Sequence, residues 1–336
     1  MAKPLVSICI PIYNGEQYLA ECIDSVLKQG IDDCEIIVVD DVSTDRSIQI
    51  VKDFQKQSPQ IKLHKNEKNL GLVGNWNKCL ELANGEWIKF VFQDDILADD
   101  CINKMLETSK ERSFVACDRE FIFDDLVSEE TKNYFNNKLL KLSSLVKSKP
   151  AIYLSNKTIS NIAASHIYLN FIGEPTAVMF KKSLVNEVGL FNANLFQICD
   201  LEYWLRIVTA KGLVFIPQKL ISFRVHANST TSRNLTGNKN FRANYFDVVI
   251  LAHDLLFNKS FAAFRNCITY FQKKKIQLFL QIKMYEAQIA FKNNATVEPL
   301  LMEELIRNYP QLQDFMNVSL RTKIIYKLLL FKRKLI

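Results

Sequence analysis

Two pairs of adjacent carboxylates stand out in this chain of 336 residues. Asp40 and Asp41 follow one apolar run, and Asp94 and Asp95 follow another, so each pair stands where a buried strand would end. A single acidic pair is also typical of a strand that simply ends in water. Two such pairs on neighbouring strands would repel each other unless a cation or hydrogen-bond donors compensate their charge. The spacing therefore indicates a site that attracts a positively charged group.

The elements that must carry these acids alternate between strand and helix. Nearly continuous apolar runs rich in Val and Ile are typical of strands buried on both faces. Such runs occur at 5–13 and 34–41, and two further strands are predicted at 61–67 and 86–95. Segments with helical periodicity separate them, at 16–30, 44–57 and 71–85. Strand–helix alternation with short links predicts an α/β fold with a parallel sheet and helices on both faces.

Ligands of parallel sheets bind beyond the carboxyl ends of the strands. Polar residues that no core requires follow all four predicted strands, namely Tyr13–Asn14, Asp40–Asp41, Asn66–Asn69 and Asp94–Asp95. We therefore expect the binding site at this edge of the sheet.

The pattern changes after residue 100. The sequence predicts a helix at 101–111 and a strand at 113–125, and then an irregular or helical insertion at 127–160 that is rich in Lys, Asn and Ser. Further along it predicts a turn, strand and short helix at 173–191, a helix at 199–212, and a strand at 213–226 that Pro217 breaks. Beyond about residue 240 the signal is helical.

The composition fits a folded globular protein, with 48% hydrophobic and 24% charged residues. The formal net charge of +7 is too small for a nucleic-acid-binding protein and suits an anionic ligand or an acidic membrane surface. The eight cysteines and four histidines are dispersed, so we expect neither disulfides nor a zinc site. The N-terminus does not resemble a signal peptide, and no apolar stretch is long enough to span a bilayer. We expect a cytoplasmic protein.

Several motifs resemble, in their order, those of family 2 glycosyltransferases of the GT-A fold. They are VSICIPIYNGEQYLAECIDSVLKQ, EIIVVDDVSTDRS, NLGLVGNWNKCLELANGEWIKFVFQDD and CDLEYWLRI, and the match covers roughly the first 230 residues. The resemblance implies a mostly parallel, twisted sheet flanked by helices. It also implies a catalytic domain at 1–235 and a helical C-terminal region at 236–336. The nucleotide-binding half would occupy about 1–110 and the acceptor half about 111–235.

The resemblance implies an inverting enzyme that moves a sugar from a UDP- or dTDP-sugar to a hydroxyl of a saccharide acceptor. At the level of the family, the expected acceptor is a lipid-linked saccharide in bacterial surface-polysaccharide synthesis. The alternative is a catalytically silent module that binds nucleotide sugars. A dehydrogenase is excluded, because IYNGEQ stands where G-x-G-x-x-G would be required.

In this family the acidic pair after the fourth strand holds a divalent metal over the diphosphate of the donor. Mn²⁺ and Mg²⁺ bind carboxylate and phosphate oxygens alike, and they neutralise charge on the departing nucleoside diphosphate. The resemblance implies Asp95 as the metal ligand, with Asp94 bound to the sugar or, through water, to the metal. His226 lies in FRVHANST, which resembles the basic segment that closes over the diphosphate, and is a second candidate to contact the metal or a phosphate.

The resemblance also assigns a donor-binding role to residues at the ends of the first three strands. One acid of the pair after the second strand usually accepts a hydrogen bond from a base with a ring N–H, such as uracil or thymine. The positions carried over are Pro11, Tyr13, Asn14, Asp40, Asp41, Asn69 and Gly71.

Sugar transfer to a hydroxyl needs a general base, and the resemblance implies Asp200, in CDLEYWLR, for that role. Glu202 is the alternative base, and Arg206 is expected to pair with an acid and orient it. Because Asp is a favoured N-cap residue, Asp200 also fits a structural role at the start of its helix.

Three residues depart from the family pattern. Phe92 stands where many relatives have the first acid of D-x-D, Val42 replaces the usual Gly after the second-strand acids, and Trp76 stands where many relatives have an Arg near the diphosphate. These changes leave the acids Asp95 and Asp200 in place.

The last 18 residues, 319–336, contain six basic residues and no acid. Leu320, Ile324, Leu328, Phe331 and Leu335 recur along one helical stripe. A basic, apolar-striped helix can lie in the interface of an anionic membrane. The alternative is a helix that packs on the catalytic domain and exposes a solvated basic face.

Overall fold

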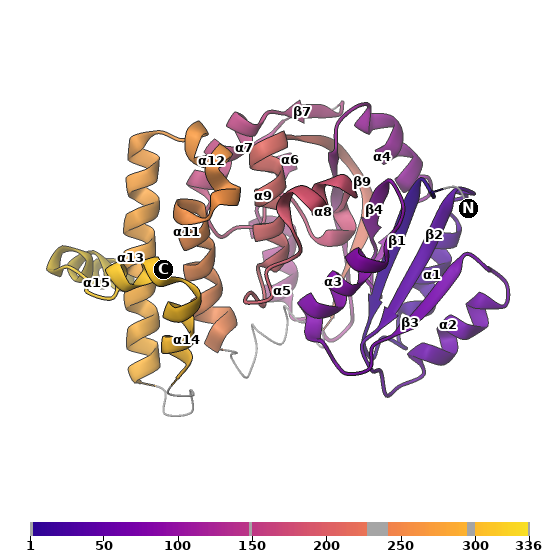
Figure 1. The fold of residues 1–336 in the computed structure, drawn as a ribbon, viewed down its shortest axis with the longest axis horizontal. Coiled ribbons are helices and arrows are strands. Elements are labelled where there is room, and N and C mark those ends of the chain that lie inside the picture. The colour runs from indigo at the N-terminus through magenta and orange to yellow at the C-terminus, as the bar shows by residue number, and fades with distance from the viewer. Residues whose placement is uncertain (1–2, 148–149, 227–240, 294–299, 335–336) are drawn as a thin grey trace.

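The computed structural model describes residues 3–147, 150–226, 241–293 and 300–334. A twisted sheet flanked by helices occupies one end of the molecule, and a stack of helices occupies the other (Figure 1). The α/β fold predicted from the sequence is confirmed.

Four parallel strands form the N-terminal part of the sheet, expected to be the nucleotide half, in the spatial order β3-β2-β1-β4. They are β1 (Val6–Ile12), β2 (Cys34–Asp40), β3 (Ile61–Lys65) and β4 (Trp87–Phe90). The helices between them are α1 (Leu19–Leu27), α2 (Ser47–Gln55) and α3 (Gly71–Leu82). Alternate side chains enter different cores: Ile36 and Val38 pack on one face of the sheet, and Ile37 and Val39 pack on the other. Burial on both faces explains the apolar runs of β1 and β2, whereas the edge strand β3 buries only Ile61 and is largely polar.

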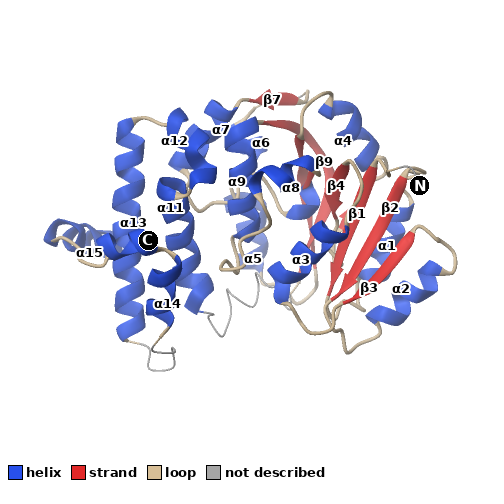
Figure 2. Cartoon of the chain, in the orientation of Figure 1, coloured by secondary structure: helices blue, strands red, loops and turns tan. Residues whose placement is uncertain are grey.

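The remaining strands make the sheet mixed (Figure 2). β8 (Val178–Lys181) pairs antiparallel with both β4 and β6 (Phe114–Phe123), and β9 (Leu213–Val225) pairs parallel with β6. Two short strands, β5 (Ile96–Leu97) and β7 (Ile152–Leu154), pair antiparallel with β9.

The prediction that Pro217 breaks the last strand is wrong, because β9 continues through it. Ile216 pairs with Cys117, but the next pair is Lys219 with Asp118, so the register shifts at this point. A bulge tolerates a proline because the extra residues make no ladder hydrogen bond.

Short helices surround the strands after residue 110, expected to be the acceptor half, and they include the insertion that the sequence predicted to be irregular or helical. They are α4 (Cys101–Ser109), α5 (Glu129–Asn133), α6 (Leu142–Leu145), α7 (Asn156–Ser165), α8 (Ser183–Val188) and α9 (Cys199–Lys211). A π-helical turn, Tyr134–Lys138, follows α5, and a 3-10 turn, Pro175–Ala177, precedes β8.

The C-terminal region is helical, as predicted. Its main helices are α11 (Asp247–Phe257), α12 (Ala262–Cys267), α13 (Tyr270–Lys292), α14 (Leu301–Asn308) and α15 (Leu320–Lys334). One hydrophobic core includes Leu251 and Leu280 from these helices together with Trp204 of the acceptor half. The boundary expected between residues 235 and 236 falls in 227–240, outside the described residues. In the described part of the chain, no helix is long and apolar enough to cross a membrane.

The shared core predicts that the C-terminal helices stabilise the catalytic part. Leu280 of α13 has no exposed surface, so Leu280→Ala should lower the free energy of unfolding by about 2–5 kcal/mol, measured by chemical denaturation. Leu320→Ala is the matched control, because that leucine is 74% exposed and its loss should change stability by less than about 0.5 kcal/mol. An equal effect of the two substitutions would contradict the shared core.

Candidate functional site

The loops after β1, β2 and β4 hold one another through side chain to backbone hydrogen bonds. Gln93 accepts a hydrogen bond from Tyr13 N at 2.9 Å and donates one to Tyr13 O at 3.2 Å. Asn14 Oδ1 accepts from Thr44 N at 2.8 Å, and Pro11 lies on β1 opposite Val39 of β2. The Tyr13 side chain is 48% exposed beside these loops. The structure thus brings Pro11, Tyr13 and Asn14 to one edge of the sheet, close to the acids of β2.

Asp40 and Asp41, the two acids after β2, differ in the number of hydrogen bonds that their carboxylates accept from the protein. Asp41 accepts from Leu70 N at 2.7 Å and Gly71 N at 2.9 Å, which fastens the start of α3. It accepts a further bond from Asn66, and Asn69 donates to its carbonyl. Within the described residues, the Asp40 carboxylate accepts a hydrogen bond from one donor, Ser43 N, at 3.2 Å. Both acids are buried, with Asp40 1% and Asp41 2% exposed, and Asp40 has fewer protein donors, while Asp41, Asn69 and Gly71 build the loop.

Val42, directly after this pair, has a φ of +66°. A positive φ is disfavoured for a β-branched residue, because its Cβ crowds the backbone. The usual glycine of the family would adopt this conformation without strain. The chain therefore holds the loop in a strained conformation beside a candidate binding site.

Asp95 is buried without any exposed surface at the end of β4. Its Oδ2 accepts from Thr176 Oγ1 at 2.5 Å, and its Oδ1 accepts from Arg224 N at 3.1 Å. Burial is the main cause that raises the pKa of Asp95 well above its ordinary value, and the negative charge of Asp94 is the second cause. Both oxygens of this carboxylate are thus engaged by protein donors.

Asp94 is more accessible, with 22% of its side chain exposed. Its Oδ2 lies 2.9 Å from Nε2 of His226, and its carbonyl accepts from Arg224 Nε at 3.1 Å. Arg224 in turn pairs with Glu21 of α1 at 2.5 Å. The structure therefore brings Asp94 and His226 together, while Asp95 lies beneath them as a buried support. The rest of FRVHANST, from residue 227, lies outside the described residues.

Asp94 and His226 fit a cation that a phosphate-bearing ligand helps to coordinate better than a cation held by protein side chains alone. Within the described ranges, no group of three or more His, Cys, Asp or Glu side chains could hold a metal ion. Asp94 and His226 still offer ligand atoms 2.9 Å apart. Mg²⁺ usually takes one or two protein carboxylates and completes its shell with substrate phosphates and water.

Two of the departures from the family pattern touch each other. The rings of Trp76 and Phe92 lie 4.9 Å apart, and Trp76 also contacts Phe90 and Phe191. Trp76 is 5% exposed, so it is part of the core. Where the resemblance leads one to expect an arginine and an acid, this chain has a packed aromatic pair.

Asp200 stands in the first turn of α9 and is partly exposed. Its Oδ2 accepts from Asn170 Nδ2 at 2.8 Å, and its Oδ1 accepts from Leu201 N at 2.7 Å. Burial is the main cause that raises the pKa of Asp200 to about 7, and the nearby charge of Glu174 acts in the same direction. The N-cap residue of α9 is Ile198, so Asp200 is not the cap of its helix.

Glu202, the alternative base, is 1% exposed and is held by Arg206. The ion pair joins Arg206 Nε to Glu202 Oε1 at 2.8 Å, and a second bond joins Nη2 to Oε2 at 2.9 Å. Arg206 also donates to the carbonyls of Val188 and Leu190. The expected pairing of Arg206 with an acid is confirmed, and its partner is Glu202. A carboxylate that is engaged and buried in this way supports the fold rather than an incoming hydroxyl.

Two residues that the sequence reasoning missed hold Asp200 in place. Asn170 joins Asp200 to Gly173 by donating to Gly173 O and accepting from Gly173 N. Asp247 of α11 accepts backbone N–H bonds from Phe196, Gln197 and Ile198, just before α9. No sequence signal marks either residue, because both partners lie far away along the chain.

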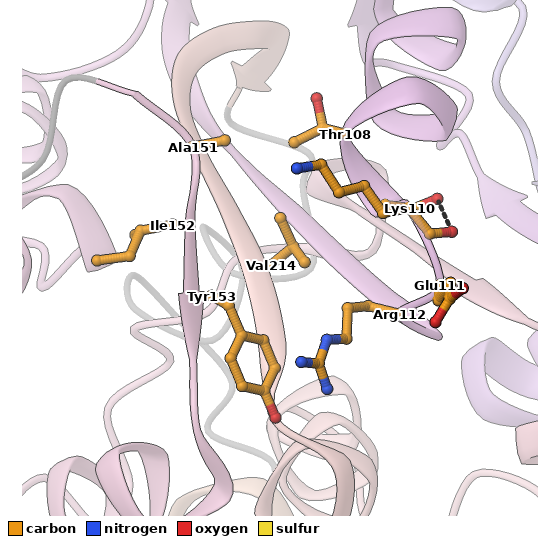
Figure 3. A pocket seen from close by; sticks show the side chains of 9 residues that line it. Thr108, Lys110, Glu111, Arg112, Ala151, Ile152, Tyr153 and Val214 are labelled. Carbon is orange, nitrogen blue, oxygen red and sulfur yellow. Dashed lines mark hydrogen bonds between the residues drawn. The ribbon is translucent and has the colours of Figure 1, made fainter.

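One cavity lies beside the site, and another lies away from it. One of about 460 Å³ is lined by Tyr18, Asp124 and His226 among others, so it opens beside Asp94. The other, of about 660 Å³, lies at the opposite ends of β6 and β9 (Figure 3). There Arg112 stacks on the ring of Tyr153 at 3.9 Å, far from the paired acids in the sheet.

Comparison with known proteins identifies the class of this fold and site. The family model described as Glycosyl transferase family 2 matches residues 7–186. A protein of Mycobacterium tuberculosis named Uncharacterized protein MT1568 is 32% identical over 241 residues, covering 71% of this chain and 73% of that protein. An uncharacterized glycosyltransferase of Haemophilus influenzae is 24% identical over 339 residues, covering 98% of this chain and 94% of that protein. The putative teichuronic acid biosynthesis glycosyltransferase TuaG of Bacillus subtilis is 39% identical over 111 residues, covering 33% of this chain and 44% of TuaG.

Solved structures agree on the fold. TarS 1-349 of S. aureus in complex with UDP-GlcNAc has a TM-score of 0.60 at 18% identity, over 94% of this chain and 82% of that chain. The mannosyltransferase PcManGT of Pyrobaculum calidifontis, in complex with GDP-Man and Mn²⁺, has a TM-score of 0.56 at 16% identity, over 97% of this chain and 84% of that chain. The fold is that of nucleotide-sugar glycosyltransferases of GT-A type. The chain belongs to glycosyl transferase family 2.

The buried hydrogen bond between Thr176 and Asp95 predicts that Thr176 stabilises the folded protein. Thr176 Oγ1 donates to Asp95 and accepts from Phe92 N, so Thr176→Val leaves two buried groups without that partner. We expect the free energy of unfolding to fall by about 1–3 kcal/mol in denaturant titrations. Thr209→Val is the matched control, because the equally buried Thr209 bonds only to Leu205 O in its own helix. A cost no greater than that of the control would argue against the role of Thr176.

Proposed function

We propose that this enzyme is an inverting glycosyltransferase that uses a UDP- or dTDP-sugar and a saccharide hydroxyl as acceptor. The observation that carries the proposal is that one segment, Gly173–Thr176, links the two acidic sites. Thr176 binds Asp95, and Gly173 binds Asn170, which binds Asp200. A site for the diphosphate and a site for the acceptor hydroxyl are thereby held at the same edge of the sheet.

On the donor side, Asp94 and His226 are the residues that would hold Mn²⁺ or Mg²⁺. When bound, such a cation neutralises charge on the departing nucleoside diphosphate. Asp40, which has fewer protein donors than Asp41, would accept the ring N–H of a base, and the exposed ring of Tyr13 offers a surface to the nucleotide. TarS with UDP-GlcNAc and PcManGT with Mn²⁺ support this reading.

On the acceptor side, Asp200 takes the proton of the attacking hydroxyl. The hydroxyl oxygen then forms a bond to the anomeric carbon, the bond from that carbon to the diphosphate oxygen breaks, and the configuration inverts. A base whose pKa lies near the working pH is suited to this task. Burial raises the pKa of Asp200 to about 7 and so brings it into that range.

The acceptor we propose is a lipid-linked saccharide in bacterial surface-polysaccharide synthesis, and the relative named for teichuronic acid biosynthesis supports this. We place the reaction in the cytoplasm, at the inner face of a membrane. The free state of all eight cysteines supports a reducing compartment.

A catalytically silent nucleotide-sugar-binding module is the second candidate, and one observation favours it: both oxygens of Asp95 are occupied by protein donors. Hydrolysis of the donor in the presence of Mn²⁺ separates the two candidates. An enzyme hydrolyses the donor slowly in the absence of acceptor, whereas a silent module only binds it.

One prediction of the proposed function concerns the cation. Asp94→Asn should abolish the Mn²⁺-dependent part of UDP-sugar affinity, measured by calorimetry with and without the metal, because it removes the accessible carboxylate. Asp99→Asn is the control, since Asp99 is an exposed acid five residues further along the chain, after β5. The role of Asp95 as the direct ligand stays a prediction that this measurement also tests. If Asp95→Asn loses the metal effect and Asp94→Asn keeps it, the cation belongs to Asp95.

The second prediction concerns the base. Asp200→Asn should keep donor binding and lower sugar transfer by on the order of a hundredfold or more. In the wild type, transfer should rise with pH through about 7, because only the ionised carboxylate accepts a proton. Asn170→Ala removes a donor that stabilises the ionised form, so the rise should move to higher pH.

Glu202→Gln is the matched carboxylate control for the base. It disturbs the ion pair with Arg206 and should lower stability, while the pH at which transfer rises stays unchanged. If Glu202→Gln abolishes transfer in a folded protein and Asp200→Asn does not, Glu202 is the base.

A further inference from the structure

An uncovered apolar stripe runs along α15, the C-terminal helix. Leu320, Ile324 and Leu328 are spaced four residues apart and are 74%, 51% and 59% exposed. The neighbouring Leu329 and Leu330 are 44% and 37% exposed. The side chains of Phe331 and Leu335, expected to extend the stripe, lie outside the described residues.

α15 packs on the protein through a different side from the one that carries the exposed apolar stripe. Thr322 is 2% exposed and donates to Gln281 of α13 at 3.1 Å. Tyr326 contacts the ring of Tyr285, also on α13, at 5.3 Å. The helix is thus attached through a hydroxyl and an aromatic ring while its leucines face outward. Packing on the domain and an exposed apolar stripe, which the sequence presented as alternatives, occur together.

The start of α13 carries a second apolar and basic surface. Tyr270 and Phe271 are 68% and 82% exposed, and Phe271 is followed within four residues by Lys273, Lys274 and Lys275, all exposed. The single acid of α13, Glu286, pairs with Lys283 at 2.7 Å. An aromatic side chain so fully exposed beside three lysines has no role in the core.

Helical geometry places these two surfaces on the same side of α13. The buried residues Ile276, Leu280 and Met284 mark the side that faces the core. At 3.6 residues per turn, Phe271 and Tyr285 are about four turns apart and project away from that side. Tyr285 contacts α15, and Figure 2 shows α15 extending beyond α13 on the side of the helical stack away from the sheet.

We propose that this surface, made of the start of α13 and of α15, docks the enzyme on an anionic membrane. Exposed apolar side chains enter the region between headgroups and acyl chains, and the surrounding lysines and arginines attract anionic headgroups. α15 supplies six basic residues and no acid over Leu320–Lys334, and α13 supplies five basic residues against one acid that is already paired. The attachment is peripheral, since the described residues include no helix that could span a bilayer.

Charge favours a lipid surface over a second copy of this chain. A symmetric dimer through α15 would bring two sets of the exposed Arg321, Lys323 and Lys327 against each other, and such like charges repel. Lipid headgroups supply the opposite charge over a wide area, as this long basic and apolar surface requires.

The test is sedimentation of the full chain with vesicles of equal parts phosphatidylglycerol and phosphatidylcholine, and with vesicles of phosphatidylcholine alone. The variants are Leu320→Ser/Ile324→Ser/Leu328→Ser, Phe271→Ser, and the chain truncated after Val318. Leu300→Ser is the matched control, because Leu300 is 65% exposed in the same region but lies outside the proposed surface. Hydrolysis of the donor, which needs no membrane, confirms that each variant is folded and separates this test from that of the proposed function.

We expect the wild type and Leu300→Ser to sediment with the anionic vesicles and to be released by salt, which screens the attraction. The triple variant and the truncated chain should bind at least about tenfold more weakly, because less apolar area is buried. Phe271→Ser should give a smaller loss. Equal sedimentation of the wild type and the triple variant would overturn the proposal. So would failure of the wild type to sediment, equal binding to phosphatidylcholine, or dimerisation that the triple substitution abolishes.

Discussion

A carboxylate with no exposed surface holds together the centre of this molecule. Asp95 accepts the hydroxyl of Thr176 and the amide of Arg224, which lie 81 and 129 residues further along the chain. These bonds join the end of β4, the turn before β8 and the end of β9. Removing either donor would leave a buried oxygen of this carboxylate without its partner, and such a group is costly inside a protein. The positions of Asp94, Arg224 and His226 all depend on this junction.

The surroundings of Asp200 are also held by polar side chains that form hydrogen bonds with backbone groups. Asp247 of the C-terminal helices holds the loop before α9, and Asn170 holds Asp200 against Gly173. The helical region therefore fixes the chain just ahead of the proposed base, Asp200. One continuous core across both regions is consistent with this arrangement.

The sequence was informative wherever a local pattern determined the structure. Buried parallel strands need unbroken apolar runs, so β1, β2 and the acids after β2 could be predicted. Partners set by tertiary contact could not be. Nothing local shows that Thr176 reaches Asp95, or that Asn170 reaches Asp200 across 30 residues. The proline of β9 misled the prediction because a bulge, which depends on the partner strand, absorbs it. The binding roles of Asp40, Asp94 and His226 stay predictions.

The bulge in β9 also restricts the length of the chain. Before it, Ile216 pairs with Cys117, and after it Arg119 pairs with Ile221. Side chains alternate between the two faces of a strand, so the number of residues in the bulge decides the face to which each later residue points. Losing one residue near Pro217 would turn Arg224 away from Asp94 and bring its neighbour Val225 to that place. The stretch that ends at His226 should therefore tolerate changes of residue type far better than a change in the number of residues.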